Sequence, residues 1–172
     1  MPKIYFITWA SGVWKTFLIS SLKEKYKNKK DWIFLHFDSI GIPSTEEMVK
    51  KFWSVENWQK ETTYKWIKEI LSEYKNKKTV IFEWQVNLEF IKNWFKKNNF
   101  SDYKIVLIDC KEEIMIDRLI NWRNQKELAN EDMKNWLQFL RKKANDLWID
   151  IIDSSDVSKE EFTKCFEKVL KD

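Results

Sequence analysis

Glycine is the residue that this sequence most clearly lacks. The 172 residues contain 2 glycines and 11 tryptophans, whereas average usage of about 7% predicts roughly a dozen glycines. Glycine supplies positive φ angles and lets the backbone approach a ligand closely. So few glycines would imply a chain that is nearly all helix or badly strained. The sequence pattern favours neither, so the shortage needs another explanation.

Cysteines and long apolar segments are scarce as well. The two cysteines, Cys110 and Cys165, lie far apart without the spacing of metal ligands, and the sequence shows no signal peptide and no long apolar run. We therefore expect a reduced, cytoplasmic protein without a membrane partner. The 31 basic and 27 acidic residues are interleaved along the chain, which argues against a nucleic-acid partner.

Short apolar runs alternate with amphipathic stretches along the whole chain. The length and the 44% hydrophobic content fit one domain, placed at 1–172. The expected strands are 3–8, 32–37, 79–82, 104–108 and 149–152, and the expected helices are 15–27, one opened by Thr45, 58–74, 87–97, 112–122, 130–147 and 158–171. This alternation predicts an α/β fold, with a parallel five-stranded sheet, helices on both faces and a ligand at the carboxyl ends of the strands.

The loop between the first strand and the first helix carries chemistry. Residues 9–16 match the phosphate-loop pattern G-x-x-x-x-G-K-[ST] in spacing, in Lys15 and in Thr16. In that pattern backbone N–H groups surround a phosphate, the lysine neutralises its oxygens and the hydroxyl holds magnesium. Trp9 and Trp14 stand where glycine is required, and an indole there blocks or opens the loop. The residues expected to contact ATP are Trp9, Ala10, Ser11, Gly12, Val13, Trp14, Lys15, Thr16 and Phe17.

Nearly the whole chain resembles the small P-loop kinases of the adenylate, shikimate and nucleoside kinase type, and among them a group of compact ATP-binding proteins labelled AAA. The segments that carry the resemblance are the phosphate loop, 37–44, 58–60, 83–85, Arg118-Leu119 with Arg123, 127–129, Asn135-Trp136 and 152–155. The resemblance implies a three-layer P-loop NTPase fold with a short lid near 118–130. It also implies ATP and Mg²⁺ as cofactors, a small-molecule phosphate acceptor, and a monomer or homodimer.

Two carboxylates end expected strands. The resemblance places Asp38 where related kinases have a carboxylate that contacts the acceptor hydroxyl or the magnesium shell, and it could act as a base. Alternatively, Asp38 caps the turn before Pro43. Glu83 could orient a magnesium-bound water or the substrate, or could be solvated at the strand end. With Thr16, these two residues are the predicted magnesium ligands.

The resemblance places Arg118 and Arg123 in the lid, where they clamp the transferred phosphoryl group, because planar guanidinium groups suit phosphate oxygens. Arg118 could instead pair with Glu113 at helical spacing. Asp153 and Ser154 follow the fifth strand, where the resemblance puts the loop that contacts adenine.

Tryptophan stands at five positions where the resemblance leads us to expect glycine, namely 9, 14, 53, 84 and 148. One decoding difference accounts for all five, because the codon UGA is read as tryptophan in some genetic codes and as glycine in others. The 28 lysines against 3 arginines fit the AT-rich gene that such a code accompanies. Our hypothesis is that the natural protein has glycine there, with Trp94 and Trp122 as further candidates. Deliberate substitution and a pseudoenzyme are the alternatives.

An ATP-dependent phosphotransferase is the leading function, with Lys15, Thr16 and Mg²⁺ positioning ATP. An ATPase that transfers phosphate to water, with Glu83 orienting that water, is one alternative. A pseudokinase or scaffold in which the tryptophans at 9 and 14 fill the site is another. The segment 44–78 contains no arginine, which disfavours a nucleoside monophosphate acceptor.

Overall fold

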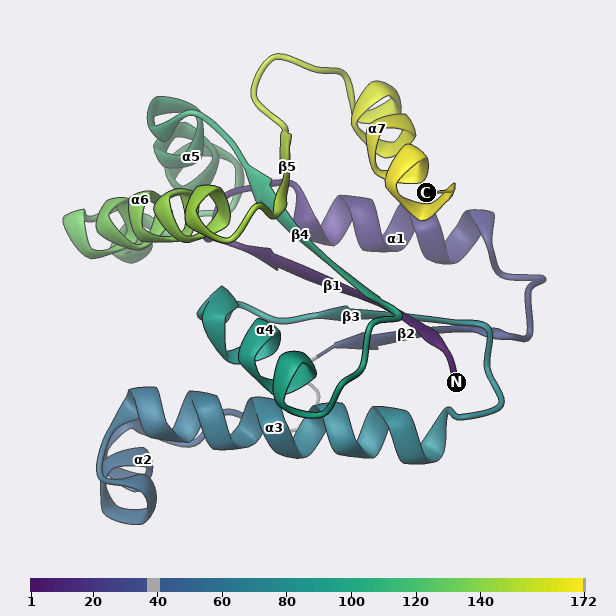
Figure 1. The fold of residues 1–172 in the computed structure, drawn as a ribbon. Helices are drawn as coiled ribbons and strands as arrows, with labels where there is room; N and C mark the ends of the chain where they lie inside the picture. The colour runs from purple at the N-terminus through teal and green to yellow at the C-terminus, as the bar shows by residue number, and fades with distance from the viewer. Residues whose placement is uncertain (37–40, 172) are drawn as a thin grey trace.

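The apolar runs form one parallel sheet in the computed structural model, which describes residues 1–36 and 41–171 (Figure 1). The strands are β1 (Lys3–Trp9), β2 (Trp32–His36), β3 (Thr79–Glu83), β4 (Tyr103–Asp109) and β5 (Asp150–Asp153). Their order is β2-β3-β1-β4-β5, and every neighbouring pair is parallel. The expected five-stranded parallel sheet is confirmed. Parallel strands need crossover connections, and the helices supply them.

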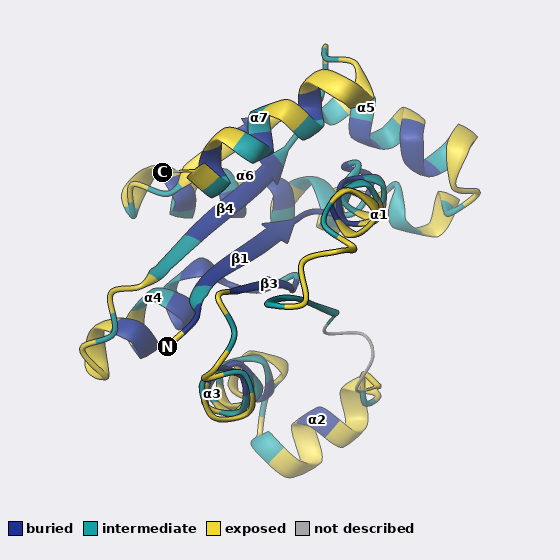
Figure 2. Cartoon of the chain, turned by 90° about the vertical axis from the view of Figure 1, so that its right-hand side faces the viewer, coloured by how far each residue is buried: buried dark blue, intermediate teal, exposed yellow. Residues whose placement is uncertain are grey.

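Helices cover both faces of the sheet, as expected (Figure 1). One face carries α1 (Lys15–Lys25) and α7 (Lys159–Lys171), and the other carries α3 (Val55–Glu73), α4 (Leu88–Lys97) and α6 (Glu131–Asp146). A shorter helix, α2 (Thr45–Phe52), packs on α3. Figure 2 shows β1 and β3 buried between these layers, while the outer sides of α2 and α3 are exposed.

Alternate residues of β1 pack on the two layers. The Tyr5 hydroxyl donates to the Leu170 carbonyl of α7 over 3.1 Å. Phe6 points to the opposite layer, where its ring lies edge-on to Phe82 at 5.2 Å and to Phe95 of α4 at 5.7 Å. The period of two in a strand produces this division. Contacts with both helical layers therefore position β1, at whose carboxyl end the predicted phosphate loop begins.

Two expected helices differ from the structure. The helix expected at 58–74 begins earlier, at Val55, because the Ser54 hydroxyl caps it by accepting from the Asn57 N–H at 3.0 Å. The helix expected at 112–122 is an α-helix only over α5 (Glu112–Asp117) and continues as a single π-helical turn, η2 (Arg118–Trp122). A 3-10 turn, η3 (Lys126–Leu128), follows it. The proposed lid segment thus begins at a departure from α-helical geometry. Within the described residues, no helix is long and apolar enough to cross a membrane.

Two tryptophans have a backbone conformation that favours glycine. Trp53 ends α2 with φ 65° and Trp148 follows α6 with φ 54°. The other non-glycine residues with positive φ in the described part of the chain are Asn99 and Asn124, and asparagine tolerates this region. Trp53 is 86% exposed and Trp148 is 94% exposed. Since neither indole is buried, side-chain packing does not compensate for the strain of the left-handed conformation.

Replacing Trp53 and Trp148 by glycine is therefore expected to raise the free energy of unfolding by about 1–2 kcal/mol at each position, the cost of the left-handed conformation for an L-residue. In a domain of this size about 2–4 °C of melting temperature accompanies each kcal/mol. Denaturant and thermal unfolding of each single variant measure the gain. The controls Asn99→Gly and Asn124→Gly should change stability little, and equal gains at the asparagine and tryptophan positions would contradict this explanation.

Candidate functional site

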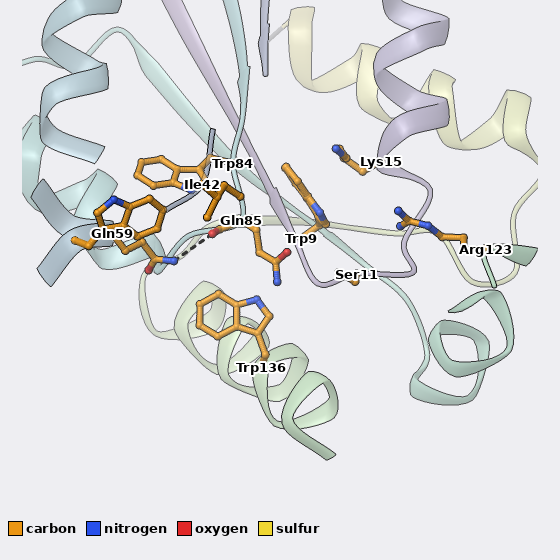
Figure 3. Close-up of a pocket in the computed structure, with 10 residues that line it drawn as sticks. Trp9, Ser11, Lys15, Ile42, Gln59, Trp84, Gln85, Arg123 and Trp136 are labelled. Carbon is orange, nitrogen blue, oxygen red and sulfur yellow. Dashed lines mark hydrogen bonds between the residues drawn. The ribbon is translucent and has the colours of Figure 1, made fainter. Parts of the chain in front are cut away.

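The predicted phosphate loop lies at the centre of the sheet, between the end of β1 and the start of α1. Trp9 is the last residue of β1, Trp14 is the N-cap of α1, and Lys15 is the first helical residue. A cavity of about 390 Å³ opens beside this loop (Figure 3). The residues that line it are Trp9, Ser11, Lys15, Ile42, Trp58, Gln59, Trp84, Gln85, Arg123 and Trp136. The cavity is at the carboxyl ends of the strands, where the sequence predicts the ligand.

Gly12 fits its position in the loop because it lacks a side chain. Its φ is +90°, and a Cβ placed on it would lie 2.8 Å from the Met115 carbonyl oxygen and 2.9 Å from the Met115 Cγ. These distances are shorter than a real Cβ tolerates, and the conformation itself favours glycine. Gly12 therefore lets the loop pack directly on α5.

Lys15 forms an ion pair with Glu83 at the end of β3. Lys15 Nζ donates to Glu83 Oε1 over 3.0 Å, and His36 Nδ1 contacts the same carboxylate oxygen. The Glu83 residue is 3% exposed. The alternative that Glu83 is a solvated strand end is therefore wrong, because the carboxylate is buried and paired with a cation.

The other carboxylate oxygen of Glu83 matters for the predicted metal. Oε2 is buried and has no hydrogen-bond partner among the described residues. A buried carboxylate oxygen without a partner is costly, and a cation or an ordered water relieves that cost. Glu83 therefore fits a Mg²⁺ ligand. No cluster of three or more metal-binding side chains occurs in the described part of the chain, so the remaining ligands would be the Thr16 hydroxyl, ATP oxygens and water.

Trp9 and Trp14 stand at the two loop positions where the pattern expects glycine, and both rings have close neighbours in the structure. Figure 3 shows the Trp9 indole beside Lys15 at the cavity, and Lys15 Nζ lies 4.5 Å from the centre of that ring. The Lys15 backbone N–H donates to the Val13 carbonyl, so this loop donor is already engaged. The centre of the Trp14 ring lies 6.2 Å from the centre of the Phe162 ring of α7. Both indoles therefore occupy space beside the predicted phosphate loop.

A second cavity, of about 370 Å³, lies on the other side of the loop. Gly12, Val13, Trp14, Thr16, Phe17, Arg118, Trp122, Arg123 and Lys159 line it. Of the residues predicted to contact ATP, five line this cavity and not the first, namely Gly12, Val13, Trp14, Thr16 and Phe17. Ala10 is fully buried behind the loop. The predicted ATP-binding residues therefore line two different cavities, and Trp14 lines the second of them.

Arg118 is held at the base of the lid segment. It is 5% exposed, and it donates from Nη1 to Ser154 Oγ at 3.0 Å and from Nη2 to the Ser154 carbonyl at 2.6 Å. Its guanidinium carbon lies 4.2 Å from the centre of the Trp14 ring. Burial lowers the pKa of the Arg118 guanidinium from its usual value, while the nearby Asp153 acts in the opposite direction. The hydrogen bonds of Arg118 thus go to Ser154 and not to Glu113, and its role as a phosphate clamp stays a prediction.

Arg123 differs from Arg118 because it lines both cavities. Its side chain is exposed, and Figure 3 shows it approaching the loop from the lid segment, on the side of Lys15 and Ser11. Of the two predicted clamp residues, Arg123 is therefore the one that faces the cavity beside Lys15.

Four described site residues do not line either cavity, namely Ala10, Glu83, Asp153 and Ser154. Asp38 lies outside the described residues. The Asp153 carboxylate accepts from the Ser155 N–H at 2.8 Å, and Ser154 Oγ donates to the Asp109 carbonyl at 2.9 Å. Neither Asp153 nor Ser154 lines either cavity. Ser154 reaches the site only through its hydrogen bonds with Arg118.

Three neutral residues of the cavity were not among the predicted catalytic, ATP-binding or metal residues. Gln59 holds the loop after β3, because its Nε2 donates to the Gln85 carbonyl and its Oε1 accepts from the Asn87 N–H, both over 3.2 Å. The Gln85 side chain and Trp136 of α6 form part of the wall (Figure 3). All three belong to segments that carry the family resemblance, and that position was the available signal.

Solved structures share the parallel five-stranded sheet with helices on both faces. No protein-family model matches the sequence, and no curated protein does. A gluconokinase from Sinorhizobium meliloti 1021 superposes with a TM-score of 0.62 and 10% identity, covering 95% of this chain and 88% of that one.

Two further structures extend the likeness. For a tunicamycin resistance protein from Deinococcus radiodurans the TM-score is 0.67 with 12% identity, covering 99% and 96% of the two chains. For a shikimate kinase from Acinetobacter baumannii, solved with shikimate, it is 0.60 with 15% identity, covering 99% and 93%. At such identities the likeness shows the fold, and function has to be argued from the site.

Proposed function

We propose that the natural protein is an ATP-dependent kinase of a small molecule and that it has glycine at positions 9 and 14. The observation that carries the proposal is the buried pair of Lys15 and Glu83 beside a cavity at the carboxyl ends of β1 and β3. A buried, partly unpaired carboxylate next to the lysine of a phosphate loop has the composition of a site for a metal-bound phosphate. The kinase fold of the solved structures agrees with this activity.

Each described residue has a distinct task in this proposal. Lys15 leaves Glu83 and neutralises phosphate oxygens, and Glu83 binds the metal through Oε2. Arg123 approaches the transferred group from the lid segment. When bound, Mg²⁺ neutralises the phosphate charge and orients it. Catalysis is then mainly positioning and charge stabilisation. Asp38 is our proposed acceptor-side base.

The structure supports glycine at four of the five positions. The Trp9 ring lies beside Lys15, the Trp14 ring packs on Phe162 beside the predicted loop, and tryptophan at 53 and 148 has positive φ with an exposed ring. Trp94 is different, because it is a buried residue inside α4 whose ring packs edge-on to Phe95 at 5.4 Å. Trp84 is also buried, and its ring centre lies 6.2 Å from that of Phe82, so glycine at 84 rests on the family resemblance alone. We propose glycine at 9, 14, 53, 84 and 148, and tryptophan at 94.

Two measurements test this function. The intact mass of the protein purified from its natural source should correspond to glycine at the five positions, and tryptophan at 9 and 14 would contradict the recoding. The chain with Trp9→Gly, Trp14→Gly, Trp53→Gly, Trp84→Gly and Trp148→Gly, called the five-glycine chain below, should release ADP faster when a small-molecule acceptor is added. Release that no acceptor accelerates would instead support an ATPase in which Glu83 orients water.

A scaffold is the second candidate, and the packing of the two indoles favours it. Trp9 is 8% exposed. The Trp14 ring packs on Phe17 and Phe162, with 6.4 and 6.2 Å between ring centres. Such contacts would stabilise a domain that binds no nucleotide. If the natural protein has tryptophan at both positions, this candidate replaces the kinase.

A further inference from the structure

The charged side chains of the cavity beside Lys15 are confined to one end. Of the ten residues drawn in Figure 3, Lys15 and Arg123 are the cations, and both lie on the side of the phosphate loop. The other end is formed by Ile42, Gln59, Trp84, Gln85 and Trp136 (Figure 3). Among the described residues that line this end, none is charged. The end away from the loop is where an acceptor would lie, because the loop end holds the phosphate.

The polar groups at this neutral end are amides and an indole N–H. The Gln59 side chain is engaged at both atoms with the loop after β3. The Gln85 side-chain amide makes no hydrogen bond within the described residues. Nε1 of Trp136 is buried and lacks a partner within them. An amide and an indole N–H can bond to hydroxyl or carbonyl oxygens, while the indole face packs against a ring.

We propose that the acceptor is an uncharged, ring-containing alcohol, a sugar or a nucleoside, that binds against Trp136 and Gln85. The inference rests on the proposed kinase function. A carboxylate or phosphate on the acceptor would lose its hydration in this end of the cavity without meeting a cation, which is costly. Hydroxyl groups lose less hydration free energy, and they can form hydrogen bonds with Gln85 and Trp136. Trp84 of this end is one of the positions where we propose glycine, so the inference uses Gln85 and Trp136.

Matched pairs of compounds test the charge rule. Glucose and glucuronate form a sugar pair, uridine and uridine monophosphate form a nucleoside pair, and methyl shikimate and shikimate form a cyclic-alcohol pair. With the five-glycine chain and ATP-Mg²⁺, kcat/KM for ADP release should be at least about tenfold higher for the neutral member, because the acid leaves a buried charge unpaired. Ligand-detected NMR measures binding of the same compounds. Comparing the pairs distinguishes a sugar from a nucleoside.

A variant reverses the preference. Gln85→Arg adds a cation to the neutral end, so it should raise the kcat/KM ratio of acid to neutral member about tenfold or more, since guanidinium groups pair with carboxylate and phosphate. Gln138→Arg makes the same exchange on the exposed side of α6 and should leave the ratio unchanged. A folding check by thermal unfolding accompanies both variants.

The outcomes separate the two proposals. If the five-glycine chain does not bind ATP-Mg²⁺, the proposed kinase function fails and this inference fails with it. If ATP-Mg²⁺ binds but the acidic members react or bind as well as the neutral ones, only the inference fails. Binding of none of the neutral compounds in the presence of ATP-Mg²⁺ also overturns the inference and leaves the kinase proposal standing.

Discussion

Replacing Trp9 and Trp14 by glycine is expected to raise the affinity for ATP-Mg²⁺ at least about a hundredfold, a change of roughly 3 kcal/mol in binding free energy. The centre of the Trp9 ring lies 4.5 Å from Lys15 Nζ, the group that we propose binds the phosphate. Removing both indoles frees the lysine and allows the loop to arrange its N–H groups around an anion. Titration calorimetry with ATP-Mg²⁺ on the chain with and without the two substitutions measures the gain.

The substitutions Trp53→Gly and Trp148→Gly supply the matched control. They also exchange two tryptophans for glycines, but they relieve positive φ at exposed positions that do not belong to the phosphate loop. We expect this pair to stabilise the chain without creating ATP affinity. Affinity that is already high with tryptophan at 9 and 14 would show that the loop is not blocked. Affinity that remains undetectable in the five-glycine chain would remove the kinase proposal.

In the five-glycine chain, Lys15→Met is expected to lower phosphoryl transfer about a thousandfold or more, because charge stabilisation is the main catalytic contribution in this class of reaction. The same change leaves the buried Glu83 carboxylate without its 3.0 Å partner. Removing one member of a buried pair costs about 3–5 kcal/mol of stability in the general case. Activity and thermal unfolding therefore have to be measured together.

A double variant separates the two effects of losing Lys15. Lys15→Met with Glu83→Gln removes both charges, so it should recover much of the stability while phosphoryl transfer stays low. Lys142→Met, on an exposed position of α6, controls for the loss of a lysine and should change neither quantity. If the double variant regained activity along with stability, Lys15 would have a structural role only.

The sheet and the adjacency of Lys15 and Glu83 could be predicted because the signals are local. Apolar runs mark strands, and the ends of neighbouring parallel strands meet at one edge, so a loop after β1 and a carboxylate after β3 lie together. The early start of α3 depends on one hydroxyl cap at Ser54. Its signal was present in the sequence but weaker than the apolar pattern that begins at Trp58.

The partner of Arg118 and the neutral character of one end of the cavity could not be predicted from local signals, although the resemblance at 83–85 indicated that Gln85 lies on the substrate side. Arg118 and Ser154 are separated by 36 positions in the sequence. Only the folded chain determines which group a long side chain reaches over such a separation. The π-helical turn from Arg118 to Trp122 likewise depends on packing at the phosphate loop. Gln85 and Trp136 carry no catalytic pattern, because amides and indoles are common in ordinary cores and loops.

The exposed rings of Trp53 and Trp148 also allow the tryptophan and glycine forms of the chain to be distinguished by optical spectroscopy. An indole that is 86% or 94% exposed emits as in water, and a chain with glycine at the two positions lacks this emission. Under the proposed recoding, absorbance per chain and the red edge of the emission spectrum would therefore report which genetic code an expression host has applied. Preparations from hosts that insert tryptophan and from hosts that insert glycine could be told apart in a cuvette before any activity is measured.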